Sequence, residues 1–172
     1  MAPEEIWEAW LVWRKALSGR NIGTYTHHHD WRTKVKPEAQ WEYDQSLSLT
    51  GSQLMQASVT RTRYYQSMLK LFESFDVLVL PSAQVWPFNV TERWPQHING
   101  QAMDTYHRWM ECTIYATLAG LPAISLPAGF HPENPWPMGI QLIGKPQGDL
   151  ELLQVAAGYE AVRSDWLQRR PV

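Results

Sequence analysis

Apolar side chains recur at helical spacing in four segments of this chain, which predicts four helices. In the first segment, Pro3 suits the first turn of a helix, and Gly19 suits a left-handed cap that ends it. The apolar stripe of this segment consists of Ile6, Trp10, Trp13 and Leu17. We expect helices over residues 3–17, 51–75, 104–119 and 149–164.

The starts of the later helices carry polar residues that can bind free backbone amides. Thr50 and Gln53 have the spacing of a capping box, and Asp104 and Asp149 can cap the third and fourth helices. The predicted inward face of the last helix consists of Leu152, Ala156, Tyr159, Val162 and Trp166. The segment from Arg20 to Lys36 is polar and we expect it to be irregular.

Short apolar runs between the helices predict three buried strands, over residues 76–81, 122–128 and 138–144. Gly120 and Pro122 separate the third helix from the second strand. We expect Gly120 to be a left-handed cap, and Pro122 disfavours helical geometry at Leu121. Residues 82–103 read as a loop with many aromatic side chains. Helices alternating with strands indicate an α/β layer architecture.

Composition and charge narrow the classes of partner. The 172 residues are 44% hydrophobic and 19% charged, and the formal net charge is −2. The chain has no excess of positive charge that would attract nucleic acid or an anionic membrane, so we expect neither as a partner. The single Cys112 excludes an intrachain disulfide and fits a reducing compartment such as the cytoplasm. No apolar run reaches the length of a membrane span, and the acidic start is unlike a secretory signal.

Three groups of residues could carry chemistry. The His27–Asp30 run offers metal-binding side chains, but adjacent residues rarely converge on one ion, which favours a polar loop. Ser82 follows a predicted strand, where active-site loops gather, yet no base is spaced beside it. A hydrogen bond from Ser82 to backbone at the strand end is the simpler interpretation. His107, Met110 and Ile114 recur at i, i+3 and i+7, so a continuous helix would place them on one face.

Several motifs together resemble the C-terminal part of amidase signature enzymes. They are FDVLVLPSA, TLAGLPAISLPAGF and PMGIQLIGKPQGDLELLQVAAGYE, and the helix-like segment starting at Leu49 is also similar. The resemblance implies an α/β fold with a mixed sheet, in which residues 1–172 form a single domain that is part of a larger amidase fold. Residues 1–48 would be an N-terminal helical and loop segment, and residues 49–172 the core.

The family's most recognisable segment has no counterpart in this sequence. That segment is rich in glycine and serine and holds the nucleophilic serine, a second serine and, upstream, a lysine. The resemblance therefore implies a C-terminal fragment of an amidase that is inactive alone and contains none of the catalytic residues. The parent enzyme would hydrolyse a small carbon–nitrogen amide without metal or organic cofactor. The alternatives are a non-catalytic binding or assembly module and a fragment of an amidotransferase-type subunit.

The resemblance also suggests which residues contact the substrate. Positions matching His107, Met110 and Ile114 line the substrate channel in relatives, although the same face could be plain core. Trp86 and Phe88 are further candidates for the same cavity. Relatives often carry proline and asparagine where this chain has Tyr115 and Thr117. An isolated piece of a larger sheet exposes strand edges and apolar surface, so we also expect the chain to form a homo-oligomer.

Overall fold

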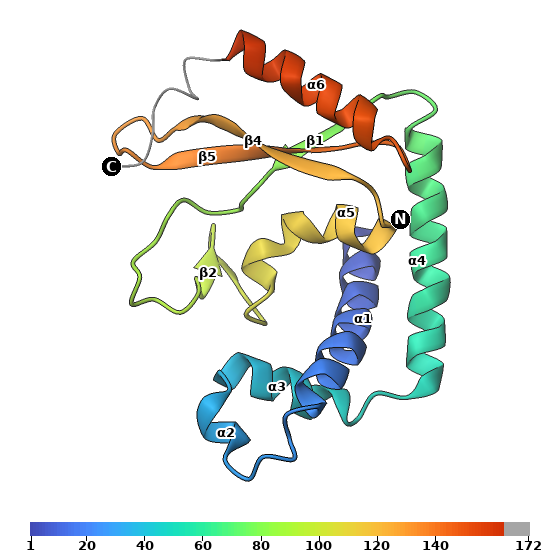
Figure 1. Cartoon of the computed structure of the whole chain (residues 1–172), viewed down its shortest axis with the longest axis vertical. Helices are drawn as coiled ribbons and strands as arrows, with labels where there is room; N and C mark the ends of the chain where they lie inside the picture. Colours follow the sequence, from blue (N-terminus) through green and yellow to red (C-terminus); the bar gives the residue numbers. More distant parts are fainter. Residues whose placement is uncertain (164–172) are drawn as a thin grey trace. The chain divides into compact units, whose positions relative to one another are not determined.

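A computed structural model describes residues 1–163, and Figure 1 shows its elements. The chain divides into two compact units, Met1–Ser67 and the chain from Met68 onward, which are described separately. The first contains α1 (Pro3–Gly23), α2 (Trp31–Lys34), α3 (Pro37–Ser46) and most of α4 (Gly51–Leu71). The second contains β1 (Leu78–Pro81), β2 (His97–Ile98), β3 (Gln101–Ala102), the 3₁₀ helix η1 (Arg108–Thr113), α5 (Ile114–Ala119), β4 (Ala123–Phe130), β5 (Pro137–Ile143) and α6 (Asp149–Val162).

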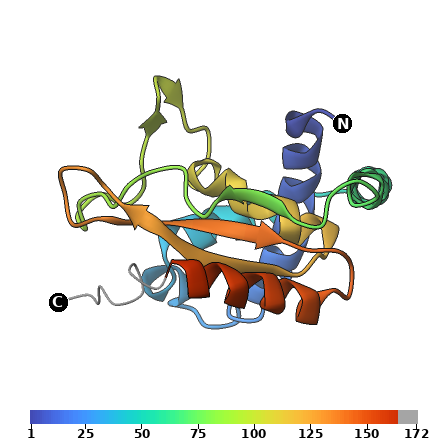
Figure 2. The same ribbon diagram turned by 90° about the horizontal axis from the view of Figure 1, so that it is seen from above.

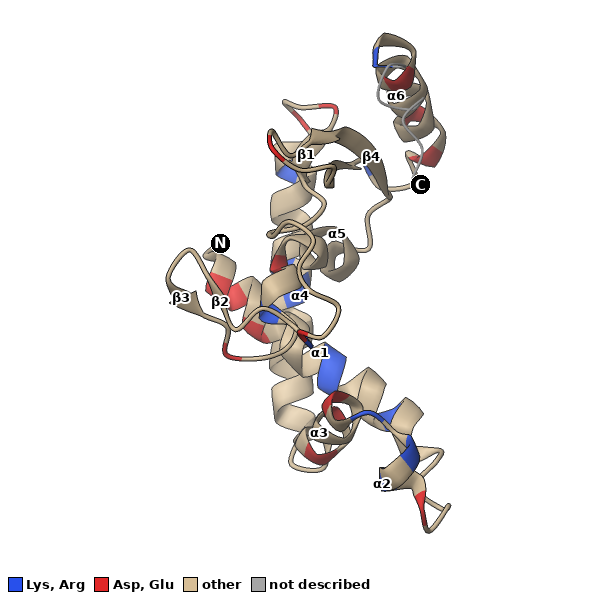
Figure 3. Ribbon diagram, turned by 90° about the vertical axis from the view of Figure 1, so that its left-hand side faces the viewer, with Lys and Arg blue, Asp and Glu red and all other residues tan. Residues whose placement is uncertain are grey.

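Helix α1 continues beyond the predicted end and passes through Gly19, so the prediction of a cap there was wrong. Gly19 is buried, and a Cβ atom added to it would overlap Ser46 at the end of α3. The glycine therefore allows close approach of two helices instead of ending one. Figure 3 shows acidic positions near the start of α1 and basic positions toward its end, the order that the helix dipole favours.

Helix α3 lies in a part of the chain where no helix was predicted. Pro37 occupies its first turn, and Glu38 follows it. Glu42 is 1% exposed and forms an ion pair with Arg14 of α1, with Nε–Oε1 and Nε–Oε2 distances of 2.9 and 3.1 Å. The buried contact of α3 with α1 thus includes a charge pair. The prediction of irregular structure from Arg20 to Lys36 was wrong in part, because this range contains the end of α1 and the short helix α2.

The capping box at the start of α4 is confirmed. The Gln53 amide N–H donates to Thr50 Oγ1 at 3.2 Å, and the Thr50 amide N–H donates to Gln53 Oε1 at 2.9 Å. The helix ends at Leu71, earlier than predicted, and Phe75 lies beyond it with 58% of its surface exposed. No helix within residues 1–163 combines the length and apolar character needed to cross a membrane.

The α/β class is confirmed, and the predicted strands form one three-stranded sheet in the order β1-β5-β4. A mixed sheet was expected, but among the described residues both strand pairs of this sheet are antiparallel. Central strand β5 pairs with β1 through Leu80↔Gln141 and with β4 through Ser125↔Gln141. The register shifts between Pro127 and Gly129, which leaves a bulge near the end of β4.

Helix α6 covers one face of this sheet (Figures 1 and 2). The buried core between them consists of Leu126, Leu142, Leu152 and Ala156. Tyr159 donates its hydroxyl to the Pro127 carbonyl at 2.7 Å, in agreement with the predicted inward face. Val162 is 80% exposed, so its predicted burial was wrong, and Trp166 lies outside the described residues. The N-cap residue of α6 is Gly148, and no side chain caps the helix, so the prediction that Asp149 caps it was wrong.

The predicted helix over residues 104–119 was wrong in its first half. Residues 108–113 form the 3₁₀ helix η1, in which Met110 has non-helical angles, φ −114° and ψ 20°. Helix α5 follows and ends at Gly120, whose φ of 71° and ψ of 39° confirm the predicted left-handed cap. In addition, the predicted loop 82–103 contains the β2–β3 hairpin, whose turn places Asn99 and Gly100 at positive φ.

Candidate functional site

The candidate site lies on the face of the sheet opposite α6. Gln141 of β5 is 7% exposed and points away from α6, because its neighbours Ile140 and Leu142 contact the α6 core. Its Nε2 donates to the Pro81 carbonyl at 2.9 Å and to the Cys112 carbonyl at 2.8 Å. These bonds attach η1 to the end of β1. The Cys112 amide N–H also donates to Gln84 Oε1 at 3.1 Å, so glutamine side chains bind both backbone polar groups of Cys112.

The three residues predicted to share a helical face differ in exposure. His107 is 2% exposed and Ile114 is 1% exposed, whereas Met110 is half-buried. The common-face argument assumed α-helical spacing, which η1 does not have, so that step was wrong. The irregular backbone at Met110 separates His107, which precedes η1, from Ile114, which begins α5. Of the three, Met110 is the side chain that reaches the surface.

The two predicted aromatic candidates have different partners. Phe88 packs edge-to-face on Trp109 of η1, with ring centroids 5.5 Å apart. Trp86 instead packs on His131 at 4.9 Å, and His131 packs on Trp136 at 5.3 Å. The structure thus brings Phe88 to the η1 segment and brings Trp86 to the loop between β4 and β5. The sequence analysis did not single out Trp109, His131 or Trp136, because their contacts join distant parts of the chain.

A charged network spans the junction of η1 and α5. The Arg108 Nε lies 3.0 Å from Glu111 Oε2, and both side chains are largely buried. The Tyr115 hydroxyl donates to Glu111 Oε1 at 3.2 Å. Burial and the neighbouring Glu111 carboxylate raise the pKa of Tyr115 to about 12. Burial also raises the pKa of the Cys112 thiol, which disfavours the thiolate form that a nucleophilic cysteine requires.

Two serines meet across the central strand on this face. The Ser82 and Ser125 hydroxyl oxygens are 2.8 Å apart, and the Ser82 amide N–H donates to the Gly139 carbonyl at 2.9 Å. The predicted backbone partner for the Ser82 side chain is thus replaced by another side chain. A Cβ added to Gly139 would lie 2.7 Å from Ser82 Oγ and 3.2 Å from Ser125 Oγ. The contact therefore depends on glycine in β5.

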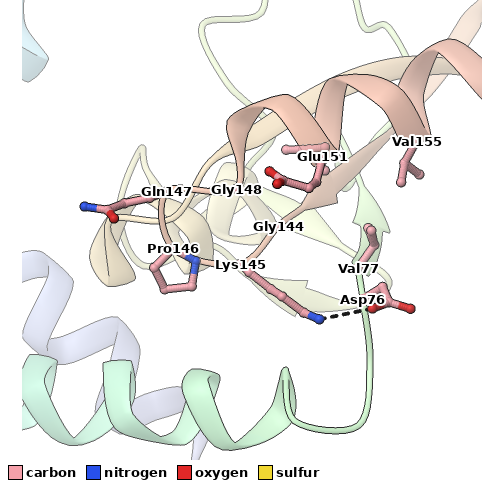
Figure 4. A pocket seen from close by; sticks show the side chains of 10 residues that line it. Asp76, Val77, Gly144, Lys145, Pro146, Gln147, Gly148, Glu151 and Val155 are labelled. Carbon is pink, nitrogen blue, oxygen red and sulfur yellow. Dashed lines mark hydrogen bonds and ion pairs between the residues drawn. The ribbon is translucent and has the colours of Figure 1, made fainter.

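A cavity of about 350 Å³ lies elsewhere in the same unit, between the start of β1, the 144–148 loop and α6. Val77, Leu152 and Val155 contribute its apolar wall, and Lys145 Nζ binds Asp76 Oδ1 at 3.0 Å beside it (Figure 4). None of the five predicted pocket residues lines this cavity. It is therefore a separate feature from the η1 segment.

The histidine run of the first unit, His27 to Asp30, lies in the turns between α1 and α2. His27 and His28 lie with ring centroids 4.0 Å apart, and Asp30 pairs with Lys34 at 2.7 Å. Within residues 1–163, no group of three or more histidine, cysteine or acidic side chains has a geometry suited to a metal ion.

Comparisons with known proteins point to one family. The family model described as Amidase matches residues 16–153. A glutamyl-tRNA(Gln) amidotransferase subunit from Dehalococcoides mccartyi is 33% identical over 117 residues, which are 68% of this chain and 22% of the relative. The protein of the same name from Alkaliphilus metalliredigens is 40% identical over 91 residues, 53% of this chain and 17% of the relative. The chain thus spans about a fifth of the length of these curated relatives.

Solved structures agree with this fold. A bacterial aryl acylamidase of the amidase signature enzymes has a TM-score of 0.81 at 23% identity, with 100% of this chain and 37% of that chain covered. A 6-aminohexanoate cyclic dimer hydrolase complexed with substrate has a TM-score of 0.75 at 21% identity, with 99% and 38% covered. At these identities the likeness establishes the fold.

Proposed function

Since this chain belongs to the amidase family, we propose that it is the C-terminal part of a larger enzyme that hydrolyses carbon–nitrogen amide bonds. The observation that supports this proposal is the family match over residues 16–153, in a chain that spans 22% of a curated relative. In this proposal residues 1–172 belong to one larger fold, with residues 1–48 as an N-terminal segment and 49–172 as the core. The free Cys112 fits a cytoplasmic enzyme.

The isolated chain is inactive in this proposal, because the family's serine, serine and lysine segment has no counterpart in its sequence. Hydrolysis of a panel of p-nitroanilides and esters by the pure chain tests this point. The expected result is release of p-nitroaniline at the rate of buffer alone. Turnover that is lost in Ser82→Ala and kept in the control Ser58→Ala would contradict it and would make Ser82 a nucleophile. Ser58 suits the control because its hydroxyl binds the Leu54 carbonyl within α4.

The η1 segment supplies one wall of the acyl pocket of the whole enzyme. Met110 presents its side chain to the substrate, and Phe88 extends the same wall through its contact with Trp109. His107 and Ile114 support this wall from the buried side, and Trp86 lies toward the β4–β5 loop. Apolar walls with few polar groups are typical of small-molecule pockets.

The variant Met110→Ala in the whole enzyme tests the wall. A pocket role predicts a change in the ratio of kcat/KM between long and short acyl chains, about tenfold or more for a change of one or two methylenes. The matched control Ile114→Ala removes a buried side chain, and it should lower stability by about 2–5 kcal/mol. An unchanged acyl ratio in Met110→Ala, with a stability loss as large as that of the control, would assign Met110 to the core.

A second candidate function is that of an amidotransferase component, which the names of the curated relatives favour. In that case the whole protein works in a complex and releases ammonia from an amide for transfer to an acceptor. The discriminating experiment compares hydrolysis of anilides with ammonia release from glutamine, with and without co-purified proteins. Glutamine-dependent release that requires a partner would favour the amidotransferase. The absence of both reactions in the whole protein would leave a binding or assembly module.

The isolated chain forms a homo-oligomer in this proposal. Strands β1 and β4 are the edges of the described sheet, and the outer surface of α6 exposes Leu150 and Leu153 at 65% and 55%. Unpaired strand edges and apolar surfaces of this kind favour self-association. Light scattering on the pure chain should show a dimer or larger species at micromolar concentration. A monodisperse monomer would contradict this part of the proposal.

A further inference from the structure

The Ser82 and Ser125 hydroxyls lie on the same face of the sheet as η1. Ser125 is the register partner of Gln141, so their side chains share a face, and Gln141 binds the Cys112 carbonyl of η1. Ser82 follows β1 and reaches Ser125 directly, which places it on that face too. The hydroxyl pair is thus on the side of the sheet that carries the proposed pocket wall.

The pair keeps one hydroxyl proton that the protein does not use. When either serine donates to the other, the accepting hydroxyl still has its own proton. Among the described residues, no further hydrogen bond from either hydroxyl is formed. Ser125 is exposed and Ser82 is half-buried, so the remaining donor can reach a ligand or water.

The strand pairing does not require this contact. Backbone hydrogen bonds already join β1 and β4 to β5, including the bond from the Ser82 amide to Gly139. Glycine within a strand weakens the strand and often marks a place where another group approaches closely. Here the missing Cβ of Gly139 provides the space in which the two hydroxyls meet.

We propose that Ser82 and Ser125 form a hydrogen-bonding subsite for an uncharged oxygen acceptor, such as a carbonyl, in the acyl part of the ligand. The subsite rests on the proposed function, because it adds a polar position on the face of the sheet to which the η1 segment with Met110 is bound. The acyl group would carry an oxygen in addition to apolar atoms. The two serines contribute binding and selectivity, and no covalent step is assigned to them.

The test uses hexanoyl p-nitroanilide and its oxo analogues, in which a carbonyl replaces one methylene of the acyl chain. In the whole protein, kcat/KM and Kd for the best oxo analogue should be about threefold to tenfold better than for the plain chain, the value of one neutral hydrogen bond. Ser125→Ala should remove this preference, and Ser125→Thr should retain it. Gly139→Ala should also remove it by separating the hydroxyls. Ser58→Ala, whose hydroxyl lies within α4, is the control that should change nothing.

The two measurements separate this proposal from the proposed function. If anilides are hydrolysed and Ser125→Ala keeps the full oxo preference, the subsite is wrong and the amidase assignment stands. If no anilide is hydrolysed, the amidase assignment fails, and Kd values for the same probes decide the subsite. An oxo preference in Kd that is lost in Ser125→Ala supports it. Equal Kd values for oxo and plain probes in the wild-type protein, or binding of neither, overturn it.

Discussion

Replacement of Gly120 by valine tests how helix α5 ends. Gly120 has a φ of 71°, and its amide N–H donates to the carbonyls of Ala116 and Thr117 at 2.9 and 3.2 Å. The Leu121 amide also donates to the Ala116 carbonyl, at 3.1 Å, so the cap satisfies carbonyls that the helix leaves free. A left-handed conformation costs a residue with a Cβ atom about 1–2 kcal/mol, with β-branched residues the least tolerant. Gly120 is exposed, so we expect backbone strain to account for most of the loss.

The expected loss of about 1–2 kcal/mol should lower Tm by roughly 2–8 °C for a chain of this size. Thermal and urea unfolding followed by circular dichroism would measure it. The matched variant is Gly120→Asn, because asparagine adopts the left-handed conformation at much lower cost. Valine should therefore destabilise the protein more than asparagine. An unchanged midpoint in Gly120→Val, or equal losses in both variants, would refute strain at the cap as the cause.

Three further variants test packing and charge. Gly19→Ala should lose about 1–3 kcal/mol because the added Cβ overlaps Ser46, and Gly19→Ala with Ser46→Gly should recover much of it in the same unfolding assay. Arg14→Leu should lower the free energy of unfolding by about 3 kcal/mol, the lower end of the range for breaking a buried ion pair, because the Arg14 side chain is 42% exposed. A loss no greater than that of Glu42→Gln would contradict a dominant charge effect. The pKa of Tyr115 is raised from 10 to about 12 in the folded protein, so this tyrosine ionises at lower pH in the unfolded chain. The free energy of unfolding should therefore fall between pH 10 and 12, and it should fall less steeply in Tyr115→Phe. Equal slopes in the two proteins would contradict this linkage.

Local signals in the sequence were sufficient for several elements. The capping box at Thr50 and Gln53 needs two side chains three residues apart, and the cap at Gly120 needs one glycine before a proline, so both could be predicted. The β2–β3 hairpin had a comparable signal, because Asn99 and Gly100 form the dipeptide that favours a tight turn with positive φ at both residues. The many aromatic side chains of residues 82–103 led instead to the prediction of a loop.

Other features depend on contacts that a local pattern does not contain. Gly19 resembles a helix stop, yet its role follows from Ser46, which approaches it from α3. The apolar spacing of residues 107–114 is compatible with an α-helix. In the structure this stretch is a 3₁₀ helix, with Met110 irregular and with Cys112 held by Gln84 and Gln141. Tertiary hydrogen bonds thus replace part of the helical pattern, and the predicted common face is lost with it.

The serine pair is the feature furthest from any local signal. Ser82 and Ser125 are 43 positions apart, and neither has a glycine-rich turn or a base beside it in the sequence. Their contact requires the order β1-β5-β4 and the antiparallel register that aligns Ser125 with Gln141. A slip of one residue in β4 would turn Ser125 toward α6 and bring an apolar neighbour to the η1 side. The register of β4 on β5 therefore decides whether this face carries a hydroxyl pair, and Gly139 decides whether the two hydroxyls can meet.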